Sequence, residues 1–435
     1  MMGIDVDYAM HRRYVFHGFD SDPQLAVLRR CLEGLLAKQP APPEPKALLE
    51  GGIAFPADVL AARQARRDRS PRLAFDAAGA PHVIFYSNRD GTNAVYLRRF
   101  NQRGEPTDDV RLSPAGEESY CADCAFDPAG TLWTVWCGRK NPKNFYDIFV
   151  HSRRPTGESA IQQITSCDDD AMSPKIAAGP DGTVVAAYYE WAYLWGYSRD
   201  RNIFARTYQP SSRAWTKAVE VSPHFPEVED HTDPDVVVDA QGKAWIVWSY
   251  DYHPQLYKNP VDADQPTIFA ARLSANTVSS PILVGATGPF REAIDLFPSA
   301  ALDTQGALWC AWDCSEPHRC IRLARLDQPA NAFKLIVTFG AAQEVCSTPE
   351  LSPAAQGQLL LAWSQRTRAQ RWQVMLRLLK EGRPTAQAAF TDDADLLFPQ
   401  PMMDPAGQYW LVYEKSNPKG SEIVLRNVTA ELKAP

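Results

Sequence analysis

One short cluster in the sequence has the residue types of a metal site. Cys314, His318 and Cys320 lie close together along the chain, and Cys346 follows after a short interval. Three thiolates and one imidazole form the closed tetrahedral ligand set that suits structural zinc. The sequence therefore predicts a structural zinc site, with unligated thiols beside an exposed histidine as the alternative. No organic cofactor is expected, since the Walker loop and the Rossmann fingerprint are both missing.

A second set of residues, in the middle of the chain, suits proton transfer and anion binding. Imidazole titrates near neutral pH, and tyrosine and histidine both serve as general acids or bases. Arginine pairs with carboxylates and sulfates. The set predicts an aromatic, basic pocket for an anionic sugar, unless the aromatic rings only pack the loops together. The candidates for catalysis are His231, Tyr250, His253 and Tyr189, and those for substrate binding are Arg139, Arg199, Glu190, Trp191, Tyr193, Trp195, Tyr252 and Arg291.

A sevenfold repeat must position these residues. Each copy has a short apolar run, an Asp-x-x-Gly turn or a variant of it, and a strand with an aromatic residue six places after the glycine. Copies spaced by 50 to 64 residues match the length of a four-stranded propeller blade. The sequence predicts an all-β, seven-bladed β-propeller over residues 70–435. The glycines are Gly79, Gly130, Gly182, Gly242, Gly306, Gly357 and Gly407, and the aromatic residues are Phe85, Trp136, Tyr188, Trp248, Trp312, Trp363 and Tyr413.

The face of the ring that carries the functional site can also be predicted. In a propeller, the loops between the second and third strands of a blade share one face with the loops that connect blades. Two of these loops are long, and they follow Tyr189 and Tyr250. Because function usually lies on variable loops of a rigid scaffold, we expect the site on this face, toward blades three to five.

Residues 1–69 differ from the repeat. Residues 23–38 have apolar residues at helical spacing, and a proline-rich break follows. Residues 47–55 are a candidate for the outer strand of blade seven, which would close the ring, and a floppy extension is the alternative. The start of the chain has no signal-peptide pattern, so we expect the protein in the cytoplasm. If a leader was trimmed from the sequence, the expectation becomes the periplasm or secretion. The formal charge of −7 argues against a nucleic-acid partner, and no membrane-spanning stretch is present.

The repeat and the Cys-x3-His-x-Cys loop together resemble the seven-bladed propeller polysaccharide lyases of the ulvan lyase type. The resemblance covers residues 70–435 as architecture, and its sharpest point is the set Cys314, His318, Cys320 and Cys346, which matches the structural zinc site of that type. It implies β-elimination beside a uronic acid without a redox cofactor. It also implies a histidine or tyrosine base, a tyrosine acid, and an arginine or histidine that neutralises the uronate.

We therefore expect a polysaccharide lyase that cleaves an anionic, uronate-containing oligo- or polysaccharide. Two alternatives stay open. One is a non-catalytic propeller that binds a glycan or a protein partner. The other is an intracellular tailoring enzyme that acts on a small metabolite, since fold alone does not determine function.

Overall fold

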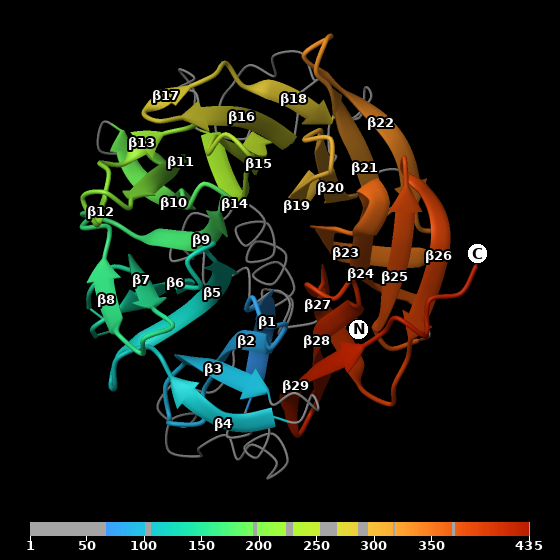
Figure 1. Ribbon diagram of the computed structural model, residues 1–435, viewed down its shortest axis with the longest axis horizontal. Helices are drawn as coiled ribbons and strands as arrows, with labels where there is room; N and C mark the ends of the chain where they lie inside the picture. Colours follow the sequence, from blue (N-terminus) through green and yellow to red (C-terminus); the bar gives the residue numbers. More distant parts are fainter. Residues whose placement is uncertain are drawn as a thin grey trace, which may run out of the picture. The chain divides into compact units, whose positions relative to one another are not determined.

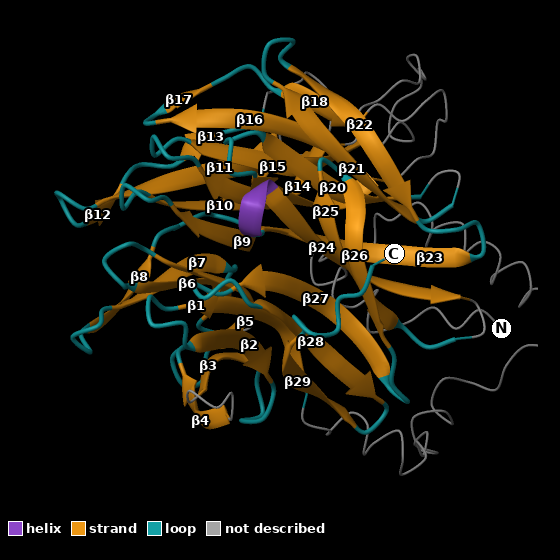
Figure 2. Cartoon of the chain, turned by 45° about the vertical axis from the view of Figure 1, so that its right-hand side comes forward, coloured by secondary structure: helices purple, strands orange, loops and turns teal. Residues whose placement is uncertain are grey.

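Short β-strands joined by tight turns and loops make up the described chain (Figure 2). The computed structural model describes residues 67–100, 106–141, 143–194, 198–222, 229–252, 268–285, 295–315, 318–367 and 370–434. The N-terminal helix expected at 23–38 and the closing strand expected at 47–55 lie outside these residues. Among the helices in this part of the chain, none has the length and apolar character needed to cross a membrane.

The strands form successive antiparallel sheets around a ring, which confirms the predicted seven-bladed β-propeller (Figure 1). Blade one contains β1 (Asp68–Phe75), β2 (Pro81–Ser87), β3 (Ala94–Phe100) and β4 (Pro106–Arg111). Blade two contains β5 (Glu118–Phe126), β6 (Leu132–Arg139), β7 (Asp147–Arg153) and β8 (Ser159–Gln163). Blade three contains β9 (Ala171–Ala178), β10 (Val184–Leu194), β11 (Ser198–Gln209) and the short outer strands β12 (Ala214–Trp215) and β13 (Val219–Glu220).

The remaining blades follow the same order from the centre outward. Blade four contains β14 (Glu229–Val238), β15 (Ala244–Tyr252), β16 (Ile268–Ser274) and the short outer strands β17 (Thr277–Val278) and β18 (Ile282–Gly285). Blade five contains β19 (Asp295–Leu302), β20 (Leu308–Cys314), β21 (Cys320–Asp327) and β22 (Ala332–Phe339). Blade six contains β23 (Glu344–Pro353), the 3-10 turn Ala355–Gly357, β24 (Gln358–Thr367), β25 (Gln373–Lys380) and β26 (Arg383–Phe390). Blade seven contains β27 (Asp395–Met403), β28 (Tyr409–Asn417) and β29 (Gly420–Asn427) in the described chain.

The core consists of apolar clusters between neighbouring blades. One cluster joins blades four and five, and others join blades five and six, six and seven, one and two, and seven and one. The aromatic residue predicted six places after each turn glycine is buried in every blade, with an exposure of at most 5% at Tyr413. In these clusters, blades one, five, six and seven bury both faces against their neighbours, as the repeat requires.

The Asp-x-x-Gly turns have the predicted conformation. In blade five, the Asp303 carboxylate accepts hydrogen bonds from the backbone N–H of Gln305 and Ala307 at 2.9 and 3.0 Å. It also accepts one from Trp309 Nε1 at 2.9 Å. Gly306 has a φ of 75°, which glycine adopts without steric cost. The aspartate thus ties the turn to the strand that follows it.

Replacing Asp303 by alanine is expected to lower the free energy of unfolding by about 2–3 kcal/mol, because the turn loses three accepted hydrogen bonds. Asp76 in blade one is the matched control, since it accepts the N–H groups of Ala78 and Ala80 without an indole bond. Urea unfolding followed by tryptophan fluorescence measures both losses. A loss for Asp76→Ala equal to that for Asp303→Ala would show that the indole bond contributes nothing.

Every innermost strand carries a bulge at the same place. The register shifts there, and one residue adopts a left-handed φ between 48° and 54°. A bulge bends the strand and redirects the next side chains. The left-handed residues are Ser70, Cys121, Ser173, Asp233, Phe297, Thr348 and Phe398. The residues two places later are Arg72, Asp123, Lys175, Asp235, Ser299, Glu350 and Gln400.

Four of these later side chains link their blade to the next one. Each accepts a hydrogen bond from a backbone N–H of the following innermost strand. The bonds run from Ile176 to Asp123 at 3.0 Å, from Ala300 to Asp235 at 2.8 Å, from Leu351 to Ser299 at 3.0 Å and from Leu73 to Gln400 at 2.5 Å. The bulges therefore align the side chains that hold neighbouring blades together.

The other three positions hold two cations and an anion. Glu350 of blade six binds Arg72 of blade one through a short hydrogen bond, and it lies 3.7 Å from the Lys175 ammonium of blade three. Arg72 also lies 3.7 Å from Asp123, and Lys175 lies 3.8 Å from Asp235. We call these five residues the central ion network. It joins blades that are not neighbours in the ring.

The central ion network makes stability depend on pH. Burial raises the pKa of Asp235 to about 6, and the Glu350 and Asp123 carboxylates add to the rise while Lys175 opposes it. The folded chain therefore binds this proton more tightly than the unfolded chain. The stability that Asp235 contributes is fully present below about pH 4 and is lost as the pH rises through about 6.

Replacing Asp235 by asparagine is expected to remove this loss. The free energy of unfolding of the wild-type protein, relative to that of the variant, should fall between about pH 4 and pH 6. Urea unfolding across that range measures the difference. Glu350 acts in the opposite direction: burial opposes the shift, but Arg72 and Lys175 hold the pKa of Glu350 below its usual range, so the stability that it contributes is lost as the pH falls. Parallel curves would contradict the prediction.

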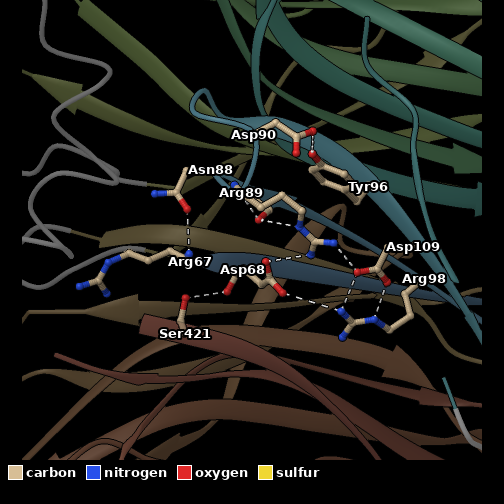
Figure 3. A network of polar contacts seen from close by, with 10 residues as sticks. Arg67, Asp68, Asn88, Arg89, Asp90, Tyr96, Arg98, Asp109 and Ser421 are labelled. Carbon is tan, nitrogen blue, oxygen red and sulfur yellow. Dashed lines mark hydrogen bonds and ion pairs between the residues drawn. The ribbon is translucent and has the colours of Figure 1, made fainter. Parts of the chain in front are cut away.

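Blade one is fastened to blade seven where the ring closes (Figure 3). Arg67 forms a parallel bridge with Ser421, whose hydroxyl donates to the Asp68 carbonyl at 2.8 Å. The Asp68 carboxylate lies 3.0 Å from Arg89 and 3.7 Å from Arg98. Asp109 binds the same two guanidinium groups at 2.5 and 2.7 Å. Paired charges thus fix the first innermost strand at the junction.

Candidate functional site

The loop face of blades two to four brings several predicted residues together. Strands β6, β10 and β15 end there, and the bulged starts of β5, β9 and β14 pair with those three ends in register. We call the set Tyr120, Tyr146, Tyr189, His231 and Tyr250 the mouth residues.

His231 and Tyr250 are register partners on β14 and β15. The His231 ring is 1% exposed, and its Nδ1 accepts a hydrogen bond from Trp248 Nε1 at 2.9 Å. In the neutral ring the proton is then on Nε2. The Tyr250 ring lies 5.2 Å from the His231 ring and packs edge-on against Phe269. The pair is thus held in one orientation by aromatic neighbours.

Tyr189 lies on β10 with an exposure of 0%. Its hydroxyl is buried and has no hydrogen-bond partner among the described residues. Burial raises the pKa of Tyr189 well above its ordinary value, and the Arg201 charge opposes that rise. The phenol therefore stays protonated and can act as a hydrogen-bond donor, but not as a base.

The next two residues of β10 point to different surroundings, because side chains alternate along a strand. Glu190 is half-buried, and burial raises the pKa of its carboxyl beside Cys167. Trp191 stacks under the Arg201 guanidinium at 4.6 Å. Arg201 is 6% exposed and was not among the predicted residues. Arg201 lies opposite Trp191 in the β10–β11 hairpin, and only the register of the two strands shows that they are partners.

Arg139 is placed near the mouth but is already paired. Its Nη2 lies 2.6 Å from Glu118, its register partner across β5 and β6. The guanidinium also stacks on the Tyr146 ring at 4.5 Å. Its charge is therefore largely compensated within blade two.

Sequence reasoning missed a chain of two phenols in blade two. Tyr120 donates a short hydrogen bond to Tyr146, and Tyr146 donates to Glu118 at 3.0 Å. Burial raises the pKa of both tyrosines. Such a chain can pass a proton toward the Glu118 carboxylate. Tyr120 directly precedes the bulge of β5, so the bulge position is the signal that would have found it.

Several predicted residues fall outside what the structure describes. His253, Trp195 and Arg291 lie outside the described residues. For Tyr193, Arg199 and Tyr252 the structure places the backbone in strands β10, β11 and β15. Tyr193 and Arg199 are register partners near the end of their hairpin. These six residues stay predictions from the sequence.

The four predicted zinc ligands converge in blades five and six. Cys314 and Cys320 are register partners, and the Cys346 N–H donates to the Arg319 carbonyl at 3.1 Å. All three thiols are 0% exposed. The Cys314 thiol holds the pKa of Cys320 down at about 7, with burial opposing. His318 Nε2 donates to the Gly340 carbonyl at 3.2 Å.

Gly340 packs closely against this cluster. A Cβ atom there would lie 2.8 Å from the Cys346 sulfur, and φ is 109°. In the ranges that the structure describes, no group of three or more His, Cys, Asp or Glu side chains has the arrangement of a metal site. The four side chains have the chemistry that zinc needs, and zinc binding stays a prediction.

Comparison with solved structures supports the fold. A polysaccharide lyase of family PL25, an ulvan lyase, matches with a TM-score of 0.55 at 10% identity over 84% of this chain and 97% of its own. The polysaccharide lyase Uly1 matches with a TM-score of 0.53 at 10% identity, over 80% of this chain and 88% of the Uly1 chain. In fold, the chain resembles the propeller polysaccharide lyases.

Other chemistry occurs on similar scaffolds. A prolyl endopeptidase matches with a TM-score of 0.50 at 13% identity, over 95% of this chain and 54% of its own. No sequence family matches the chain, and no curated protein matches it significantly. At these identities the similarity to the propeller lyases establishes the architecture and leaves the reaction to be argued from the site.

Proposed function

We propose that the protein is a carbohydrate-active enzyme, a polysaccharide lyase that cleaves an anionic, uronate-containing glycan by β-elimination at the mouth residues. The observation that carries this proposal is the His231–Tyr250 pair, whose members are register partners at the loop end of blade four and whose rings lie 5.2 Å apart. The fold of the propeller lyases supports it. One of those lyases was solved bound to -[GlcA(1-4)Rha3S]-, a saccharide of this kind.

The reaction needs a proton acceptor, a proton donor and a group that neutralises the carboxylate. The base removes the proton at C5, and the C–H electron pair forms the C4=C5 double bond. The C4–O4 bond breaks as this double bond forms, and the departing oxygen takes a proton from the acid. Neutralising the adjacent carboxylate stabilises the charge that develops at C5.

The structure supports a division of these roles. Tyr250 is the proton-transfer residue in our proposal, because it is the more exposed member of its pair. His231 positions Tyr250, since Trp248 fixes its ring and burial keeps it from the substrate. Tyr189, whose hydroxyl is buried like the His231 ring, supports the site from below and does not contact the substrate in this proposal. Arg201, which stacks on Trp191 across the β10–β11 hairpin, neutralises the carboxylate in this proposal.

The proposal is tested by incubating the full chain with a panel of uronate polysaccharides and their oligomers. Ultraviolet absorbance of the new conjugated double bond should rise with one substrate class. Boiled protein is the control for spontaneous elimination. Chain cleavage without new absorbance would show hydrolysis and would contradict the lyase proposal.

A non-catalytic glycan-binding propeller is the second candidate. The compensated charge of Arg139 and the burial of His231 favour it, because a binding surface needs no proton transfer. Calorimetric binding of a uronate oligomer, with no absorbance change in the same sample, is the result that would establish it.

We include in the proposal a structural zinc ion held by Cys314, His318, Cys320 and Cys346. The His318 Nε2–H bond to a carbonyl leaves Nδ1 with the lone pair that a metal ligand needs, which is the usual outer-shell arrangement. The low pKa of Cys320 favours the thiolate. When bound, the ion would cross-link the loop after β20 to the start of β23 and take no part in the reaction.

Elemental analysis of the purified protein should find about one zinc per chain. Cys320→Ser should lose most of the metal and lower the thermal midpoint, because metal binding contributes to folding. Cys167→Ser is the control, since Cys167 lies in a loop before β9 and not in this cluster. A metal-free protein with an unchanged midpoint after zinc addition would contradict the prediction.

A further inference from the structure

We propose that a groove between blades four and five binds a neutral saccharide. The groove lies on the face of the ring that carries the Asp-x-x-Gly turns, which we call the turn face. The groove has a volume of about 1000 Å³ and is lined by the first turns and the outer hairpins of these two blades. That volume is at the upper end of the range of small-molecule pockets. The groove lies at the opposite end of β15 from Tyr250, because its lining includes the turn residues before Ala244. It is therefore separate from the mouth residues.

Paired charges make the groove close to neutral. The Asp239 carboxylate binds the Arg272 guanidinium through a short hydrogen bond. Burial acts to raise the pKa of Asp239, but Lys243 N–H and Arg272 hold it below its usual range, so it stays ionised and paired. Asp303 is bound by Trp309 and lies 3.5 Å from Arg325. Among the described residues that line the groove, the only cation is Arg272, and Asp239 compensates its charge.

The arginine pairing changes the role of a tryptophan. In blades two, five and seven, the indole N–H six places after the turn aspartate donates to that aspartate. In blade four, Arg272 takes the equivalent Asp239 oxygen instead. Trp245 Nε1 then has no hydrogen-bond partner among the described residues, and it is not one of the fully buried polar atoms. Trp245 lines the groove, so this donor is available to a ligand.

Side-chain amides supply the other polar groups. The residue before the turn glycine is Gln241 in blade four and Gln305 in blade five, and both line the groove. The equivalent residue is alanine in blades one, two and seven. Gln328 and Asn331 come from the outer hairpin of blade five. Each amide offers a donor and an acceptor, which matches a hydroxyl group that is both.

A neutral saccharide is the ligand that this chemistry fits best. It presents many hydroxyl groups to the amides and the indole N–H, and it carries no charge that would need a partner. The C–H faces of its rings can lie against the apolar side chains that line the groove, among them Val238 and Leu302. A peptide would satisfy some of the same amides and is therefore the main competitor.

The test uses the full chain and three probe classes: neutral xylo-, manno- and cello-oligosaccharides, uronate oligosaccharides, and short uncharged peptides. Saturation-transfer NMR detects binding, and calorimetry gives the affinity. The double variant Gln241→Ala/Gln305→Ala should weaken binding of a neutral oligosaccharide about tenfold or more. Gln356→Ala is the control for loss of an amide, because Gln356 also directly precedes a turn glycine, in blade six, but does not line the groove.

The outcomes separate this site from the mouth. Binding of a neutral oligosaccharide that is weakened by the double variant but not by Gln356→Ala or Tyr250→Phe supports the proposal. It does so whether or not the protein is a lyase. Loss of binding in Tyr250→Phe alone would place the saccharide at the mouth and overturn the proposal. Binding of peptides instead, or of no neutral oligosaccharide, would also overturn it.

Discussion

Replacing Glu350 by alanine is expected to lower the free energy of unfolding by about 3–5 kcal/mol, because it leaves two partly buried cations without their shared anion. Glu350 lies against Arg72 on one side and Lys175 on the other, from two other blades. Its carboxylate also accepts a hydrogen bond from Ser299 at 3.4 Å. Urea unfolding at neutral pH measures the loss.

Two further variants show whether the charge or only the packing matters. Glu350→Gln keeps the volume and should still lose most of the stability, since an amide does not neutralise the cations. Glu158→Ala removes the partner of Arg154 in an exposed ion pair and should change little. A Glu350→Ala protein as stable as Glu158→Ala would contradict the structural role of the central ion network.

Replacing Tyr250 by phenylalanine is expected to reduce lyase turnover by about 10²–10⁴-fold, the usual contribution of one proton-transfer group. The ring still packs against Phe269 and His231, so the fold should be preserved. Initial rates of ultraviolet absorbance give the turnover. Tyr208→Phe is the matched control, because Tyr208 lies at the other end of blade three against Trp133.

His231→Asn separates positioning from chemistry. If His231 orients Tyr250, the variant should lower turnover less than Tyr250→Phe and should shift the pH profile, whereas a purely structural residue would lower the amount of folded protein only. Near-ultraviolet circular dichroism controls for folding. Wild-type turnover and an unchanged pH profile in both variants would remove the pair from the mechanism.

The ring was predictable because its signals are local. A turn glycine with positive φ and an aromatic residue six places later recur in every copy, and the structure gives each glycine a φ between 71° and 86°. The burial of the aromatic residue follows from stacking between blades. His231 and Tyr250 could be predicted to lie near each other for the same reason, since both belong to blade four, and the structure makes them register partners.

Pairings across the ring were not predictable in this way. Arg72 and Glu350 are separated by 278 positions and meet only because bulges of two distant blades direct them to the centre. The sequence showed Arg139 as a cation on a loop, but only the register of β5 and β6 reveals that Glu118 binds it.

The central ion network also has a consequence for how the ring assembles. An open repeat array can add or lose units at its ends with little cooperativity. Here, an arc that lacks blade six would hold Arg72 and Lys175 without Glu350, and an arc that lacks blade one would hold Glu350 with one cation fewer. Partial arcs are therefore penalised electrostatically. Folding should be slow, since these contacts join distant parts of the chain, and unfolding should proceed as a single step rather than blade by blade.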